Sequence, residues 1–307
     1  MPPSGPPDTD LRAAAPGEYP GLRAIGDGTI TPTRIYRPGE PIPIPDRVPW
    51  SLLGPEFAKI WGRADPADPQ PEHMEIIGPN GSGKTHYLAT VLQDRVRVRN
   101  SSSVLIATKP ADATLLKLGW PVTDDWADMR RMRQVIFWPK TRLLGDARKA
   151  YQEAKIKELL ERLWVPESNT IVAFDDIGYA ESLEKLKGLI EMYWREARSQ
   201  GITAVGMKQR PQGANRHMSS ETPWTAAFVP KDQADKERFA ELFGRKQDWL
   251  PVFDAMDPDK HEFLLRHTRT RATYISWCDL PLRPAAPPRQ DRSAREYLFG
   301  VRENERQ

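Results

Sequence analysis

Apolar and polar residues follow two different periods along the middle of the chain. Short continuous apolar runs are typical of strands buried on both faces, and longer stretches with apolar residues three or four positions apart are typical of helices. The runs that predict strands are 73–77, 103–108, 133–138, 170–176, 202–207 and 224–229. The stretches that predict helices are 84–96, 145–164, 180–200 and 232–243. Because strands alternate with helices, the sequence predicts an α/β fold with a parallel sheet covered by helices on both faces.

The end of this pattern predicts a β-hairpin, and both ends of the chain differ from the middle. Residues 261–267 and 272–278 alternate in polarity around a polar turn, 268–271. Proline is frequent at both ends, and it fixes φ and removes a backbone donor, which favours extended or disordered backbone. We expect an arm over 1–50, a central domain over 51–280 and a Pro/Arg-rich tail over 281–307, in which 293–304 could form a short amphipathic helix.

A glycine-rich turn stands between the first predicted strand and the first predicted helix. Residues 78–85 read GPNGSGKT, which fits the phosphate-binding pattern GxxxxGK[ST]. Glycines let successive backbone N–H groups point inward, and the dipole of the following helix favours the same anion. We expect Lys84 to reach the β and γ phosphates of ATP, and the hydroxyl of Thr85 to ligate Mg²⁺. The residues predicted to bind the nucleotide are Gly78, Pro79, Asn80, Gly81, Ser82, Gly83, Lys84, Thr85 and His86.

Two aspartates follow the apolar run 171–174. Asp175 and Asp176 would stand at the carboxyl end of a neighbouring strand, where their side chains would meet the phosphate loop. ATP hydrolysis requires an acid that holds the metal and a base that activates water. We therefore predict that Asp175 ligates Mg²⁺ and that Asp176 polarises the attacking water. The alternative is a solvated turn after a buried strand, and an aspartate reaches the water less well than a longer glutamate.

The strand predicted at 202–207 delivers Lys208, Gln209 and Arg210 to the same end of the sheet. Gln209 could hydrogen-bond the γ phosphate or the attacking water, and would thus report hydrolysis to the sheet. Gln209 is therefore a predicted catalytic residue. The alternative is that these three residues simply open a polar loop.

Together these segments resemble the FtsK/HerA superfamily of P-loop DNA-pumping ATPases. The resemblance rests on 196–235, with its arginine, Gly-Ile, apolar strand and Gln-Arg-Pro run, and on 106–120, where a lysine and a leucine-rich helix follow an apolar strand. It extends over about residues 72–245. It implies a RecA-like core that works as a ring, usually of six subunits, and moves double-stranded DNA.

The resemblance also implies that the nucleotide lies between subunits and that an arginine from the neighbour completes the site. Arg198 stands where the family has an arginine before its Gly-Ile, and Arg195 lies one turn earlier. Either could stabilise charge in the transition state, and Arg198 is the predicted catalytic residue; the alternative is a solvated arginine at a helix end. The chain shows no family-like membrane segment, large N-terminal module or winged-helix DNA reader. This favours the short members, which include viral genome-packaging and conjugation ATPases, although Asp-Asp replaces the commoner Asp-Glu.

Composition limits the partners and the location. The net charge is only +3, so nucleic-acid binding would need a local basic surface. Two clusters could line a channel or form a solvated face: Arg95, Arg97 and Arg99, and Arg130, Arg131 and Arg133. The single cysteine, Cys278, excludes an internal disulfide and suits a reducing compartment. No apolar run approaches the ~18 residues that span a bilayer, so we expect a cytoplasmic protein, in the host cytoplasm if it is viral.

Two functions from different classes fit these features. The first is a motor that hydrolyses ATP between ring subunits to move double-stranded DNA. The second is a nucleotide-gated assembly or interaction protein of a virus or mobile element, with low turnover. A small-molecule kinase is disfavoured because no lid with paired arginines is evident. His261, His267 and Cys278 fit no zinc spacing and are expected to be structural, and most of the 10 tryptophans are expected in the core or at subunit interfaces.

Overall fold

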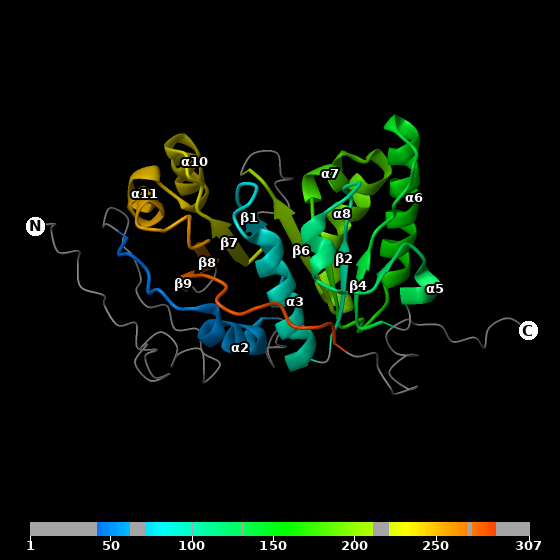
Figure 1. Ribbon diagram of the computed structural model, residues 1–307, viewed down its shortest axis with the longest axis horizontal. Helices are drawn as coiled ribbons and strands as arrows, with labels where there is room; N and C mark the ends of the chain where they lie inside the picture. Colours follow the sequence, from blue (N-terminus) through cyan, green and yellow to red (C-terminus); the bar gives the residue numbers. More distant parts are fainter. Residues whose placement is uncertain are drawn as a thin grey trace, which may run out of the picture.

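The computed structural model describes residues 42–61, 72–99, 101–129, 132–210, 221–268 and 272–286. The described residues form a nine-stranded sheet in the order β3-β4-β2-β5-β6-β1-β7-β8-β9 (Figure 1). Strands β3 to β7 in this order pair in parallel, and the last two pairings are antiparallel. The strands are β1 Met74–Ile77, β2 Ser102–Ile106, β3 Val122–Thr123, β4 Gln134–Phe137, β5 Thr170–Phe174, β6 Ile202–Lys208, β7 Trp224–Phe228, β8 Phe263–His267 and β9 Thr273–Ser276.

Helices cover both faces of this sheet, because its strands carry apolar side chains on both sides. The helices are α2 Trp50–Ile60, α3 Lys84–Arg99, α4 Ala113–Lys117, α5 Trp126–Met129, α6 Gly145–Leu163, α7 Ile177–Ser182, α8 Glu184–Glu196, the 3₁₀ helix η1 Ala197–Gln200, α10 Gln233–Phe243 and α11 Lys246–Asp254. In β1, Met74 and Ile76 pack with α2 and α3, whereas Ile77 packs with α10 and α11. On this second face, α6 and α8 cover β2, β4, β5 and β6. The predicted α/β class, with a parallel sheet covered on both faces and a C-terminal hairpin, is confirmed.

One expected neighbour relation is wrong. We expected the strand that ends in the aspartate pair to lie beside the strand that enters the glycine turn. In the structure β6 lies between them, paired in parallel with β5 on one side and with β1 on the other. Chain order reveals which segments are strands but not which strands pair, because a crossover can place a later strand between two earlier ones.

Three helices were not predicted, the short α5 and the longer α2 and α11, and each of the two longer ones contains a proline. Proline inside a stretch argues against a helix in sequence-based reasoning. The apolar spacing of α2 nevertheless buries Trp50, Leu53 and Phe57, with Trp61 beyond its end, against α3 and the sheet. Tertiary packing therefore overrides the low local propensity.

The helix predicted over 180–200 is interrupted at Leu183. The backbone of Leu183 is extended, with φ −82° and ψ 113°, so α7 ends there and α8 begins at the next residue. A carboxylate oxygen of Glu153, from α6, accepts a hydrogen bond from the backbone N–H of Lys185 at 3.1 Å. A side chain that is distant in sequence thus caps the second helix, which no periodicity could reveal.

Described parts of the predicted arm and tail lie against the central domain. The backbone N–H groups of Val48 and Trp50 donate to the carbonyls of Ile275 and Trp277 at 2.9 and 3.0 Å. The segment 279–286 crosses α3, and the side chain of Gln93 contacts the backbone of Arg283 there (Figure 1). The amphipathic stretch 293–304 lies outside the described residues. Within the described chain, no helix is both long enough and apolar enough to cross a bilayer.

Candidate nucleotide-binding site

The glycine turn connects β1 to α3 as the pattern requires. Strand β1 ends at Ile77 and α3 begins at Lys84. Gly83 has φ 96°, in the region that L side chains rarely adopt, and a Cβ there would lie 3.3 Å from the Cβ of His261. A Cβ on Gly78 would lie only 2.6 Å from the Cβ of Phe228 in β7. The two glycines therefore let the turn fold tightly and lie close to the neighbouring strand.

A cavity of about 480 Å³ opens beside this turn at the carboxyl edge of the sheet. The predicted residues that line it are Asn80, Gly81, Ser82, Gly83, Lys84, Thr85, His86, Asp175, Asp176 and Gln209. The structure thus brings the glycine turn, the aspartate pair and the glutamine to one space, although they come from three strand ends. Pro79 lines a second cavity of about 380 Å³ on the other side of the turn.

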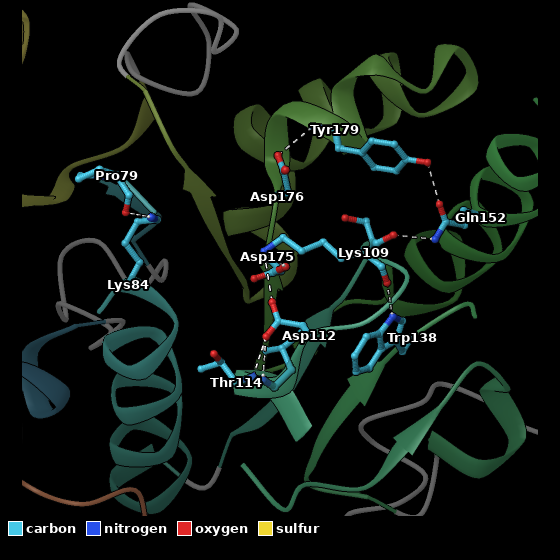
Figure 2. Close-up of polar contacts among 12 residues, drawn as sticks. Pro79, Lys84, Lys109, Asp112, Thr114, Trp138, Gln152, Asp175, Asp176 and Tyr179 are labelled. Atoms are coloured by element: carbon cyan, nitrogen blue, oxygen red, sulfur yellow. Dashed lines mark hydrogen bonds and ion pairs between the residues drawn. The ribbon is translucent and has the colours of Figure 1, made fainter. Parts of the chain in front are cut away.

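Lys84 stands at the base of the turn and is largely buried. Its ammonium group donates a hydrogen bond to the carbonyl oxygen of Pro79 at 2.7 Å (Figure 2). Burial, and then the charge of Lys109, lower its pKa from 10.5 to about 8. A desolvated cation that faces a cavity favours an anion entering that cavity, since the anion would restore the lost electrostatic stabilisation.

Asp175 is the most enclosed acid of the site, with a side chain that is 0% exposed. The ammonium group of Lys109 lies 3.2 Å from one of its carboxylate oxygens, and the other oxygen, Oδ1, has no hydrogen-bond partner. Burial raises the pKa of Asp175, and the charge of Lys109 opposes that rise. A buried carboxylate with unused acceptor capacity is the type of group that hard divalent cations prefer.

Asp176 has a local structural contact that sequence reasoning missed. It is the N-cap of α7, and its Oδ1 accepts a hydrogen bond from the backbone N–H of Tyr179 at 3.0 Å. The hydroxyl of Tyr179 donates to the side-chain oxygen of Gln152 at 2.7 Å (Figure 2). Asp176 therefore lines the cavity and begins a helix at the same time, which orients its carboxylate.

The end of β6 places two polar residues in different environments. Gln209 is exposed and lines the cavity. Lys208 is buried and forms an ion pair with the buried Glu75 of β1. A buried charged pair therefore joins β6 to β1, the strand that enters the turn, and Gln209 follows β6 as an exposed residue at the cavity.

The structure does not bring Arg198 or Arg195 to this cavity within one chain. Arg198 belongs to η1, which precedes β6, so it lies at the amino edge of the sheet. There it is close enough to His73 for its charge to lower the pKa of that histidine. Arg195 is exposed and pairs with Glu191 at 3.5 Å. A role for Arg198 in a neighbouring subunit stays a prediction.

Sequence reasoning missed several residues of the cavity wall: Lys109, Asp112, Thr114, Met207, Phe228, His261 and Cys278. Lys109 and Asp112 could have been found, because they follow the strand predicted over 103–108 and the carboxyl ends of parallel strands share one edge. His261 and Cys278 come from the two ends of the hairpin, and no local signal relates them to the turn. The third residue of the predicted structural group, His267, lies elsewhere and contacts Glu72 at 3.1 Å.

The residues present fit a nucleotide with a divalent cation. The glycine turn offers backbone space that side chains would fill, and Asp175 offers a carboxylate oxygen without a partner. Among the described residues no group of three or more His, Cys, Asp or Glu side chains could hold a metal by itself. Mg²⁺ is usually held by one or two protein oxygens together with phosphates and water, and the carboxylate of Asp175 is a donor of this kind.

The predicted basic clusters have different environments. Arg95 is buried, with its guanidinium 2.8 Å from the hydroxyl of Thr203 and over the ring of Trp61 at 4.7 Å. It therefore belongs neither to a solvated face nor to a channel, because packing of α3 against the sheet encloses it. Arg97 is exposed, and Arg133 is half-buried with a hydrogen bond to the carbonyl of Val96. Arg130 and Arg131, and the side chain of Arg99, lie outside what the structure describes.

The strand, glycine turn and helix, with a buried acid at the same edge of the sheet, have the arrangement of the P-loop NTPase fold. No protein-family model matches this sequence, and no curated protein matches it significantly. Among solved structures the chain is similar to the genome packaging NTPase B204 from Sulfolobus turreted icosahedral virus 2 in complex with AMPPCP. The TM-score is 0.51 with 12% sequence identity, covering 68% of this chain and 98% of that chain.

The chain is also similar to B204, the DNA-packaging ATPase from Sulfolobus turreted icosahedral virus. That comparison has a TM-score of 0.50 and 13% identity, and it covers 70% of this chain and 97% of that chain. At this identity the likeness concerns the fold. The resemblance read from the sequence is therefore confirmed at the level of the fold, and its functional content belongs to the proposal below.

Proposed function

We propose that this protein is an ATPase that uses Mg²⁺ and couples hydrolysis to the movement of double-stranded DNA. The observation that carries the proposal is the convergence of Lys84, Thr85 and the buried Asp175 on one cavity at the carboxyl edge of the sheet. These are the residue types that hold triphosphate and metal in P-loop enzymes. The relatively distant likeness to a viral DNA-packaging ATPase supports the choice of DNA as the substrate to be moved.

In this proposal each part of the site has one task. The backbone of 78–85 and the ammonium group of Lys84 hold the β and γ phosphates, and the Thr85 hydroxyl and Asp175 hold Mg²⁺. When bound, Mg²⁺ neutralises phosphate charge and acts as a Lewis acid. The support for these roles is that all three side chains border the same cavity and that Asp175 retains an unused carboxylate oxygen.

Asp176 is proposed to accept the proton of the attacking water, and Gln209 to hold that water or the γ phosphate. The N-cap contact from Tyr179 to Oδ1 of Asp176 orients the carboxylate and leaves its second oxygen for water. Gln209 is exposed at the cavity, so its amide can turn toward a ligand. Both residues are less buried than Asp175, as is expected of groups that act on a water molecule.

The proposed working form is a ring in the cytoplasm, with six chains as in the family that the sequence resembles. Arg198 from one chain would complete the site of the next and stabilise charge on the transferred phosphate. Its position at the amino edge, opposite its own chain's cavity, supports action between chains over action within one chain. In mixed assemblies Arg198→Ala subunits should be partly rescued by wild-type neighbours, whereas strictly proportional activity would argue against a shared site.

The test of the proposal is the ATPase rate of the full chain with and without duplex DNA. We expect duplex DNA to raise the rate, and we expect Asp176→Asn to keep ATP bound while hydrolysis falls by at least about 100-fold. Asparagine caps a helix as well as aspartate does, so loss of rate in this variant is not a folding effect. Normal turnover in Asp176→Asn would move the base role to another residue.

One observation favours the second candidate, a nucleotide-gated assembly protein of a virus or mobile element. Asp176, the second acid of the pair, already caps helix α7 through its carboxylate. Such a group would activate water poorly, and ATP binding alone could then drive assembly. Slow turnover that ignores DNA, together with assembly that requires ATP, would favour this second function.

A further inference from the structure

Lys109 lies between two carboxylates at the edge of the cavity. Its ammonium group is 3.2 Å from Asp175 and 3.3 Å from Asp112, and all three residues border the same cavity as Lys84 (Figure 2). Asp175 is fully enclosed, whereas the side chain of Lys109 is 39% exposed toward the open space. Lys109 is therefore the cation that is paired with the buried acid.

The backbone beneath Lys109 is held in place, so only its side chain can change partners readily. The carbonyl of Lys109 accepts a hydrogen bond from the indole of Trp138 at 2.8 Å. The carbonyl of Thr108 accepts hydrogen bonds from Arg148 at 2.7 Å and from Gln152 at 2.9 Å. Two side chains of α6 and one from the connection between β4 and α6 thus fix the position from which the lysine extends. Figure 2 shows Trp138 and Gln152 among them.

This arrangement bears on the proposed metal role of Asp175. Mg²⁺ on Oδ1 of Asp175 would share the negative charge that now stabilises Lys109 on Oδ2, and the two cations would repel each other, so the hold of Asp175 on Lys109 would weaken. The ammonium group would then gain from pairing with another anion, and the cavity that it borders is the one proposed to receive the triphosphate. Lysine suits such an exchange because its charge sits at the end of a flexible stem.

We propose that Lys109 is a second phosphate-binding lysine, which leaves Asp175 and pairs with the γ phosphate when nucleotide and metal bind. The inference rests on the proposed function, since it assigns a ligand to the same site. It makes Lys109 specific for a triphosphate, because a diphosphate leaves the lysine without its new partner. It also makes Asp112 the anchor that is given up in the exchange.

Asp112 connects this exchange to the fold. Its Oδ1 accepts the backbone N–H groups of Thr114 and Leu115 at 2.9 and 3.1 Å and so caps α4, while its Oδ2 holds Lys109. Asparagine at this position would keep the cap but weaken the hold on Lys109. A weaker hold on Lys109 lowers the cost of moving the lysine, and therefore favours the triphosphate-bound arrangement.

The experiment is calorimetric titration of the full chain with a non-hydrolysable ATP analogue and with ADP, each with and without Mg²⁺. We expect Lys109→Met to lower the affinity for the ATP analogue by about 10-fold or more while ADP affinity changes little. We expect Asp112→Asn to raise the affinity for the ATP analogue several-fold, again with little change for ADP. The ratio of the two affinities isolates the γ phosphate from general effects of charge near the cavity.

Two controls keep the result decisive. Asp259→Asn removes another aspartate near the glycine turn, one that pairs with Lys231, and should leave the ratio unchanged. Asp112→Asn tests the exchange even if Lys109→Met fails to fold around the unpaired Asp175. Equal changes for both nucleotides in Lys109→Met, or an unchanged ratio in Asp112→Asn, would overturn this inference alone. Wild-type protein that binds neither nucleotide would overturn the proposed function, and this inference with it.

Discussion

The two edges of the parallel sheet both carry buried charged or titratable side chains, but they use them differently. At the carboxyl edge, Lys84 and Asp175 border a cavity, and Asp175 retains a carboxylate oxygen without a partner. At the amino edge, Arg95 lies over Trp61, and His73 packs against Trp194 with ring centroids 5.3 Å apart. Charge that faces a cavity is available to a ligand, whereas charge enclosed by tryptophan and neighbouring strands contributes to folding alone.

The largest expected effect lies at the carboxyl edge. Lys84→Ala should reduce ATP affinity at least about 100-fold, because it removes the cation that reaches the phosphates. The free energy of unfolding should hardly change, because the substitution removes a cation whose desolvation disfavours folding. Calorimetric titration and thermal unfolding measure the two quantities. An unchanged affinity would mean that Lys84 does not bind the phosphates. The proposed difference between the two edges would then be wrong.

The opposite pattern is expected for Arg95 at the amino edge. Arg95→Ala should lower the free energy of unfolding by about 3 kcal/mol, because it leaves the hydroxyl of Thr203 and the face of Trp61 without their buried partner. ATP affinity of the folded variant should stay the same. The exposed Arg97→Ala on the same helix is the matched control and should change stability by less than about 0.5 kcal/mol. Equal effects of both variants would show that Arg95 is not enclosed.

His73 should make the amino edge sensitive to acid. Burial, and then the charge of Arg198, lower its pKa from 6.5 to about 3, so folded protein keeps it neutral. Below pH 6.5 the unfolded chain binds a proton that the folded chain does not, and stability is lost as the pH falls toward 3. We expect a loss of about 2 kcal/mol between pH 8 and pH 5 from this residue.

Urea unfolding at the two pH values measures this loss. The control is His73→Asn, whose side-chain oxygen can still accept the N–H of Ala204 that now donates to Nδ1 of His73 at 3.0 Å. The variant should lose less stability on acidification than the wild type does. Identical pH profiles would assign the acid sensitivity to other groups.

The smallest effect on stability is expected at Asp176, which borders the cavity and also has a structural role as a helix cap. Asp176→Ala should cost about 1 kcal/mol of stability, because the N–H of Tyr179 loses its cap. Asp176→Asn should stay within about 0.5 kcal/mol of the wild type, since it keeps the cap. Chemical unfolding of both variants separates the structural contribution from any effect on hydrolysis. Equal stability of the two variants would mean that the cap contributes little.

The sequence alone determined the parts of this protein that depend on local patterns. The glycine turn, the strand before it and the helix after it are contiguous, so their relation follows from backbone chemistry. Asp175 was found because the carboxyl ends of parallel strands meet at one edge, wherever the strands lie in the sheet. The same rule applied to the strand before Lys109 would have found that residue too.

Only the tertiary structure decided which strands are neighbours, which charges are enclosed and what completes the cavity wall. It placed β6 between β1 and β5, enclosed Arg95 between α3, the sheet and Trp61, and brought His261 and Cys278 to the glycine turn. These outcomes depend on contacts between residues far apart in the chain. Periodicity records which side of an element is buried, but not which distant segment covers it.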